Sequence, residues 1–244
     1  MSEMASVTST GFARRKHPGS QDTAPDHNGT GFSAEKSGVL GSILRRAMYC
    51  FVLAVMQFFP ALVSAGNQKE EALADSVRIA LSNAITDTRP PKVVIEDINE
   101  RIKYLYWRGE MSERLKRRMS DAQVRLEFLE TVWYESKRAG LDPALVLGLI
   151  QVESAFRKYA VSHVGARGYM QVMPFWTRVI GDSDPKKLFH MQSNLRYGCS
   201  ILRMYIDMEK GDLFLGLGRY NGSRGRSEYP NAVLAAWKQW QYVP

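Results

Sequence analysis

The chain has 244 residues, of which 45% are hydrophobic and 24% are charged, a composition typical of a globular protein with one core. Its formal net charge of +8 would suit an anionic partner such as nucleic acid, anionic lipid or cell wall. The basic residues are spread along the sequence, and we find no zinc finger, RNA-binding signature or helix-turn-helix pattern, so we expect no nucleic-acid partner.

Residues 1–38 are rich in Ser, Thr, Gly, Pro and His and contain few large apolar side chains. Such a segment cannot bury enough apolar surface to offset the entropy that it would lose on ordering. We therefore predict a disordered N-terminal tail over these residues.

Residues 39–65 have the form of a secretory signal peptide. Arg45 and Arg46 precede an apolar run over residues 47–59, and Val-Ser-Ala at residues 63–65 is an acceptable cleavage signature. The apolar run is short for a membrane span, which needs about 20 residues. We expect an exported, periplasmic protein, and the alternative is an uncleaved anchor that holds the chain at the inner membrane, facing the periplasm.

Two stretches with helical periodicity follow, over residues 68–85 and 93–106, and the Thr-Arg-Pro-Pro sequence at residues 88–91 separates them. Gly109 is expected to end the second helix. We predict a helical extension over residues 66–120 and assign no chemistry to it.

The main domain is predicted over residues 121–244. Asp121 is expected to cap a helix that Gly140 ends. Cys199 would be the only cysteine after cleavage at residue 65, and its apolar neighbours indicate a buried, inert thiol.

The next helix carries the residue on which the functional prediction depends. Asp142 is a good N-cap and Pro143 is tolerated at the first helical position. Glu153 lies near the end of this helix, beside a stripe of apolar residues at helical spacing: Leu145, Leu149, Val152 and Phe156. Burial beside apolar residues should raise the pKa of its carboxyl, as a general acid near neutral pH requires. A glutamate at the solvated rim of a core helix is the alternative.

Three short motifs follow one another in this domain. They are Glu153-Ser154, the sequence GYMQVMP at residues 168–174, and RYNG at residues 219–222. Together they resemble the motifs E-S, G-L-M-Q-[VI]-x-P and A-Y-N-x-G of the family 1 lytic transglycosylases, the SLT domain. The resemblance covers about residues 122–240, and it implies a mainly α, lysozyme-like fold, here preceded by extra N-terminal helices.

The resemblance also implies a set of site residues and no metal or cofactor. By this resemblance Glu153 would be the catalytic residue, and the substrate-binding or orienting residues would be Ser154, Met170, Gln171, Tyr220, Asn221 and Tyr229. Ser154 would orient the Glu153 carboxylate by a hydrogen bond, and Gln171 and Asn221 would bind the glycan. Met170 and Gln171 are expected at the start of a helix.

The sequence departs from the family pattern at four places. Tyr169 stands where the family usually has Leu, and the third motif departs at Ser223 and at two cations, Arg219 and Arg224. We hypothesise that these two cations suit the anionic peptide stem of the substrate.

Ordinary glycosidases use two carboxylates, but no Asp or Glu lies between Glu153 and Asp182. The resemblance implies that Glu153 alone protonates the β-1,4 glycosidic oxygen between N-acetylmuramic acid (MurNAc) and N-acetylglucosamine (GlcNAc). It would then take a proton from the C6 hydroxyl, giving a 1,6-anhydroMurNAc end. The alternatives are lysozyme-like hydrolysis, and a weakly active glycan-binding component of an envelope-spanning secretion assembly. Peptidoglycan glycan strands are the expected partner, with envelope or secretion-system proteins as further possible partners.

Overall fold

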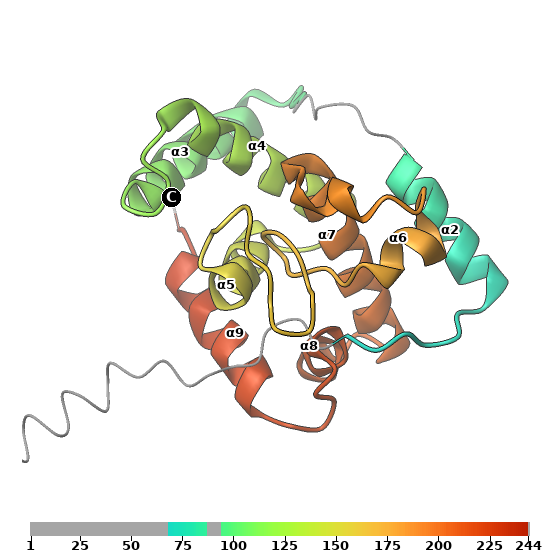
Figure 1. The fold of residues 1–244 in the computed structure, drawn as a ribbon. Helices are drawn as coiled ribbons and strands as arrows, with labels where there is room; N and C mark the ends of the chain where they lie inside the picture. The colour runs from blue at the N-terminus through green and yellow to red at the C-terminus, as the bar shows by residue number, and fades with distance from the viewer. Residues whose placement is uncertain (1–67, 87–93, 244) are drawn as a thin grey trace, which may run out of the picture. The chain divides into compact units, whose positions relative to one another are not determined.

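The computed structural model describes residues 68–86 and 94–243, and Figure 1 shows them as a ribbon. All of them belong to the second of two units, Pro60–Pro244. The predicted tail over residues 1–38 and the predicted signal segment over residues 39–65 lie outside the described residues.

The described part of the chain is built from helices and has no strand, only two isolated bridges. This confirms the expectation of a mainly α fold with helices ahead of the main domain. The elements are α2 (Asp75–Thr86), α3 (Ile98–Leu115), α4 (Ala122–Arg138), α5 (Pro143–Ser154), α6 (Phe175–Ile180), the 3-10 helix η1 (Pro185–Phe189), α7 (Met191–Met208), α8 (Leu213–Asn221) and α9 (Glu228–Trp240). Within the described ranges, none of these helices has the length and apolar character needed to cross a lipid bilayer.

Aspartate side chains cap four of the described α-helices. Asp97, Asp121, Asp142 and Asp212 each accept a hydrogen bond from a backbone N–H in the first turn of α3, α4, α5 and α8. Such a cap satisfies one of the N–H groups that a helix start leaves without a partner. The predicted caps Asp121 and Asp142 are confirmed.

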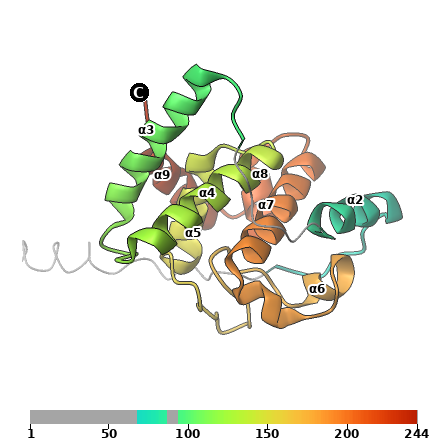
Figure 2. The ribbon, with the colours of Figure 1, turned by 90° about the horizontal axis from the view of Figure 1, so that it is seen from above.

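Helix α5 is almost entirely buried and packs along α9, as both ribbon views show (Figures 1 and 2). Gly148 allows this close approach, because an added Cβ would lie only 2.6 Å from the backbone nitrogen of Trp237. The contact brings the last turn of α5, which carries Glu153, near the first turn of α9, which carries Tyr229.

Helix α3 differs from its prediction, because it runs past Gly109 to Leu115. A glycine inside a helix costs about 1 kcal/mol relative to alanine. Burial of apolar residues beyond Gly109 offsets this cost, because Met111 and Leu115 are fully buried in the same core as α4. Packing against the rest of the fold therefore overrides the local helix-ending signal.

The chain before α2 also differs from its prediction. Residues 68–74 form no helix, and α2 begins only at Asp75. Helix α2 then packs against α6 and α7, and its Leu81 and Ile85 belong to the main hydrophobic core. The first part of the predicted extension is thus packed against the main domain (Figure 1).

Candidate active site

Glu153 lies in the last turn of α5 and is only 5% exposed. Its Oε1 accepts a hydrogen bond of 2.5 Å from the hydroxyl of Tyr229. Glu153 is therefore a buried carboxyl held by a buried tyrosine, and the alternative of a glutamate at a solvated rim does not describe it.

The backbone directly after Glu153-Ser154 is strained. Ala155 and Phe156 both have left-handed conformations, with φ of 49° and 65°. Each such non-glycine residue costs roughly 1–3 kcal/mol and persists only where the surroundings hold it. Here the Phe156 ring packs against Phe128 and Trp240, at centroid distances of 6.1 and 5.3 Å. Helix α5 thus ends abruptly at Ser154, with the left-handed Ala155 as its C-cap.

Ser154 is buried, and its hydroxyl donates to the carbonyl of Ile150, one turn back, at 3.1 Å. A serine hydroxyl has one proton to donate. The structure therefore directs that proton into the helix, whereas Tyr229 donates to the carboxylate of Glu153.

Tyr220 and Tyr229 are both buried, and both lie within electrostatic range of Glu153. Burial first, and then the charge of Glu153, raise the pKa of each tyrosine well above its usual value. Both hydroxyls therefore keep their protons at physiological pH. The proton of Tyr229 goes to Glu153, and that of Tyr220 goes to the backbone carbonyl of Met170 at 2.8 Å.

The second motif is a turn rather than the expected helix start, and α6 begins only at Phe175. Gln171 has a positive φ of 49°, which a right-handed helix does not allow. Its side-chain Nε2 donates to the carbonyls of Ala160 and Gly168, at 3.1 and 2.9 Å. In the structure Gln171 therefore braces the loop that precedes it.

Met170 is fully buried, and its side chain lies against Gly198 of α7, where an added Cβ would come within 2.3 Å of the sulfur. Its backbone N–H donates to Asn194 Oδ1 at 2.8 Å. Met170 thus meets Tyr220 through its carbonyl while its side chain fills the core.

Asn194, a residue that sequence reasoning did not assign to the site, holds the second motif on α7. Its Nδ2 donates to the carbonyls of Arg167 and Leu188, both at 2.9 Å, while its Oδ1 accepts from Met170. An added Cβ on Gly168, whose φ is +77°, would lie 2.4 Å from that Nδ2. The only sequence signal was a polar residue near the start of a mostly apolar helix.

Asn221 ends α8 and is 5% exposed. Its Nδ2 donates to Ser223 Oγ at 3.1 Å, and its Oδ1 is buried without a hydrogen-bond partner among the described residues. A buried acceptor without a partner is costly. The lone pairs of this oxygen are therefore not engaged by a hydrogen bond from any residue that the structure describes.

The two cations of the third motif are engaged within the protein. Arg224 Nε lies 2.6 Å from Glu209 Oε1, Arg219 also pairs with Glu209, and Arg219 Nη1 lies 3.1 Å from Glu71. Arg224 first, and then Arg219, lower the pKa of Glu209 to about 2. These pairs count against the hypothesis that Arg219 and Arg224 bind an anionic peptide stem.

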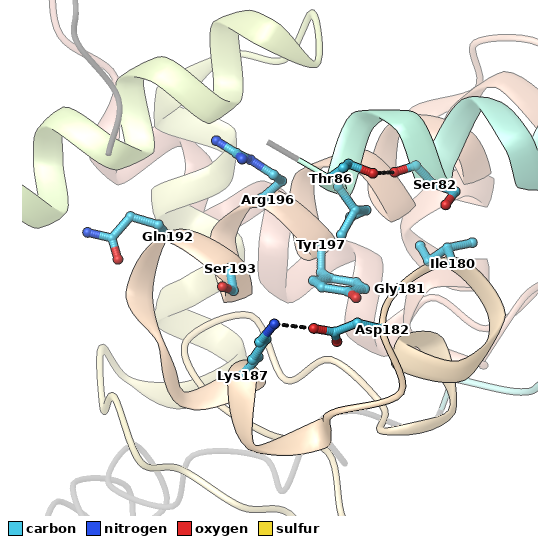
Figure 3. Close-up of a pocket in the computed structure, with 11 residues that line it drawn as sticks. Ser82, Thr86, Ile180, Gly181, Asp182, Lys187, Gln192, Ser193, Arg196 and Tyr197 are labelled. Atoms are coloured by element: carbon cyan, nitrogen blue, oxygen red, sulfur yellow. Dashed lines mark hydrogen bonds and ion pairs between the residues drawn. The ribbon is translucent and has the colours of Figure 1, made fainter. Parts of the chain in front are cut away.

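The remaining candidates for chemistry lie elsewhere. Cys199 is buried, and burial raises the pKa of its thiol, as expected of an inert core cysteine. Among the residues that the structure describes, no group of His, Cys, Asp and Glu could hold a metal ion. A separate cavity of about 320 Å³ lies between α2, α6 and α7 and is lined by no predicted site residue. Figure 3 shows its lining residues, among them the Asp182–Lys187 ion pair.

Known proteins resemble the part of the chain that carries these residues. The family model for the transglycosylase SLT domain matches residues 130–238, which include all seven predicted site residues. The membrane-bound lytic murein transglycosylase C of Actinobacillus pleuropneumoniae is 37% identical over 94 residues, which are 38% of this chain and 24% of that protein. The transglycosylase of Enterobacteria phage PRD1 is 32% identical over 116 residues, 45% of this chain and 42% of that protein.

Among solved structures, an inactive mutant of the lytic transglycosylase Slt from Pseudomonas aeruginosa superposes with a TM-score of 0.42 and 22% identity, over 57% of this chain and 29% of that one. The chain spans less than half the length of the curated relatives named above. The match to the transglycosylase SLT domain thus includes the buried Glu153 and both tyrosines, and over residues 130–238 the chain is similar to the SLT lytic transglycosylases.

Proposed function

We propose that the protein is a peptidoglycan lytic transglycosylase that cleaves the β-1,4 bond between MurNAc and GlcNAc without water. The observation that carries this proposal is the buried Glu153 carboxyl, bonded by Tyr229 within an SLT domain. The names of the relatives, lytic murein transglycosylase and transglycosylase, support the same activity.

In the proposed reaction, Glu153 begins protonated and gives its proton to the glycosidic oxygen, so that the bond to the MurNAc C1 breaks and GlcNAc leaves. The acetamido oxygen of MurNAc supports the cation that develops at C1. Tyr229, which stays protonated, donates to the carboxylate that proton transfer leaves on Glu153. A hydrogen bond to the charged form stabilises it.

In the second half, the C6 hydroxyl of the same sugar attacks C1 and closes the 1,6-anhydro ring. The ionised Glu153 takes the hydroxyl proton and returns to its starting state. Acid and base are thus one group that gives and recovers one proton, and general acid–base catalysis of this kind contributes about 10²–10⁴-fold.

The other predicted site residues have supporting roles in this proposal. Asn221 offers its buried Oδ1 to an N–H or hydroxyl of the glycan. Met170 links Tyr220 to the second motif through its carbonyl, and Gln171 and Ser154 stabilise the backbone on either side of the loop.

We further propose that residues 121–244 form the catalytic domain, that residues 66–120 are its extension, and that the protein acts in the periplasm after export. The relatives described as membrane-bound support an envelope location. An inner-membrane anchor over residues 39–65 is the alternative form of the same proposal.

Product mass tests the activity. Purified residues 66–244 are incubated with peptidoglycan, and the released fragments are analysed by mass spectrometry, with Glu153→Gln as the control. Fragments lighter than the hydrolytic products by one water support the transglycosylase. Hydrolytic masses would assign a lysozyme-like muramidase instead, and glycan binding without any release would favour a binding component of an envelope assembly.

A further inference from the structure

The chain segment before α2 crosses the SLT domain although it lies outside the residues that the family model matches. Gln68 is the first residue of the described chain, and its side chain is nevertheless buried, with only 4% of the residue exposed. Buried amide side chains are uncommon unless they make hydrogen bonds, so the contacts of Gln68 are informative.

Gln68 makes two hydrogen bonds to the segment that follows the second motif. Its Oε1 accepts from the indole Nε1 of Trp176 at 2.9 Å and from the backbone N–H of Met173 at 3.3 Å. The Trp176 side chain is buried, so this indole N–H depends on a residue more than 100 positions earlier in the sequence. The oxygen of Gln68 therefore ties the end of the second motif to the start of α6.

The amide nitrogen of Gln68 is buried and makes no full hydrogen bond to a described residue. The Gln68 side chain nevertheless opposes the rise in the pKa of the Tyr220 hydroxyl in the third motif. The same hydroxyl donates to Met170. Gln68 thus lies where the second and third motifs meet, beside the tyrosine whose pKa responds to the charge of Glu153.

Two ion pairs hold the residues next to Gln68 on the same domain. Glu70 lies 3.3 Å from Arg178 of α6, and Glu71 lies 3.1 Å from Arg219, the residue before Tyr220. The Glu70–Arg178 pair is largely exposed and the Glu71–Arg219 pair is partly exposed, so each contributes little alone. They nevertheless direct the segment to α6 and α8, the helices that Gln68 links.

We propose that Gln68 is a positioning residue for the transglycosylase reaction: it fixes the second and third motifs relative to each other, so that Tyr220 and the Met170 turn are held in place beside Glu153. The inference rests on the proposed function of the site. Gln68 does not touch the reacting atoms; it acts through Trp176, Met173 and Tyr220.

The test compares three variants of the full chain on a soluble GlcNAc-MurNAc tetrasaccharide. Gln68→Leu keeps the size of the side chain and removes both polar atoms. Small misplacement of catalytic groups lowers turnover strongly, so we expect kcat to fall by roughly 10-fold or more while KM changes by less than about 2-fold. Gln68→Glu keeps an acceptor oxygen at the same length and should recover most of that turnover.

Glu70→Ala is the matched control, because it removes a contact of the same segment without touching the two motifs. It should leave kcat unchanged. Circular dichroism and thermal melting are measured for every variant, since a purely structural role would lower the melting temperature without lowering kcat in the folded protein. A folded Gln68→Leu variant with wild-type kcat would overturn the proposal.

If Gln68→Leu does not fold, Gln68→Asn takes its place, because its shorter side chain cannot reach both N–H groups at once. The same fall in kcat is expected, and unchanged turnover would again refute the role. Hydrogen exchange of the Trp176 indole N–H, measured by NMR and assigned with Trp176→Phe, needs no activity. A protected N–H in a protein that does not cleave glycan would support the Gln68–Trp176 hydrogen bond and refute the proposed function. A rapidly exchanging N–H would refute the hydrogen bond itself, and with it the proposed role of Gln68.

Discussion

At the scale of single residues, the site depends on one carboxyl and the group that donates to it. Glu153 is buried in the last turn of α5, and Tyr229 reaches it from α9 across 2.5 Å. The sequence placed Glu153 in a buried helix correctly, because Asp142, Pro143 and the apolar stripe are local signals. It assigned the orienting bond to Ser154, whose hydroxyl instead donates to Ile150, because side-chain direction depends on packing that no motif encodes.

Replacing Glu153, the proposed catalytic residue, should lower turnover strongly without unfolding the protein. Glu153→Gln keeps the shape of the side chain and removes the proton that the reaction needs, so we expect a loss of roughly 10²–10⁴-fold. The rate at which soluble muropeptides are released from peptidoglycan measures this loss of turnover. Degradation at the wild-type rate by a folded variant would refute the role of Glu153.

Removing only the donor should have a smaller effect. Tyr229→Phe deletes the hydroxyl that stabilises the ionised Glu153, and hydrogen bonds to charged groups are strong enough for a loss of roughly 10-fold in kcat. Tyr106→Phe is the control, because Tyr106 is 65% exposed on α3, away from the site. Equal turnover in both variants would show that the bond to Glu153 is dispensable.

At the scale of helices, the α5–α9 contact sets the distance between Glu153 and Tyr229. Two glycine-to-alanine substitutions separate the effect of this close contact on the free energy of unfolding from the effect of helix propensity. Gly148→Ala places a Cβ 2.6 Å from the Trp237 backbone, and such overpacking should cost about 1–3 kcal/mol. Gly109→Ala, on the exposed face of α3 with nothing within 4 Å, should instead stabilise by about 0.5–1 kcal/mol.

Urea unfolding monitored by circular dichroism measures both variants. The two changes add the same methyl group to a helix, so their difference isolates the close contact. Equal free energies of unfolding would mean that α5 and α9 do not approach each other at Gly148.

The α7–α8 region contains the ion pairs of Glu209, and they predict a pH dependence. Arg224 and Arg219 hold the pKa of Glu209 at about 2, against 4.5 for an ordinary glutamate. The stabilisation is present above about pH 4.5 and is lost as the pH falls toward about 2, because the unfolded chain binds the proton first. Melting temperatures between these pH values should fall less steeply for Glu209→Gln than for the wild type, and parallel slopes would contradict the pairing.

At the scale of the whole molecule, local patterns predicted the helical fold and the order of the motifs, and they failed where distant segments meet. The caps Asp121 and Asp142 needed only their own neighbours. The extended path of residues 68–74 and the pairing of Arg219 with Glu71 and Glu209 needed the tertiary structure. Sequence reasoning therefore found the residues of the family motifs and missed Gln68 and Asn194, which hold those motifs together.

The buried start of the described chain matters for anyone who trims this protein to its recognisable core. A fragment cut at residue 130, where the family match begins, would keep every motif and yet strip the acceptor from the indole of Trp176. The cut would expose the surface around Trp176 and Arg178. The indole N–H of Trp176 would lose its hydrogen-bond acceptor, and the guanidinium of Arg178 would lose its ion-pair partner. Weak activity in such a minimal fragment would then reflect the loss of the chain before residue 130, including Gln68, and would say little about the chemistry of Glu153.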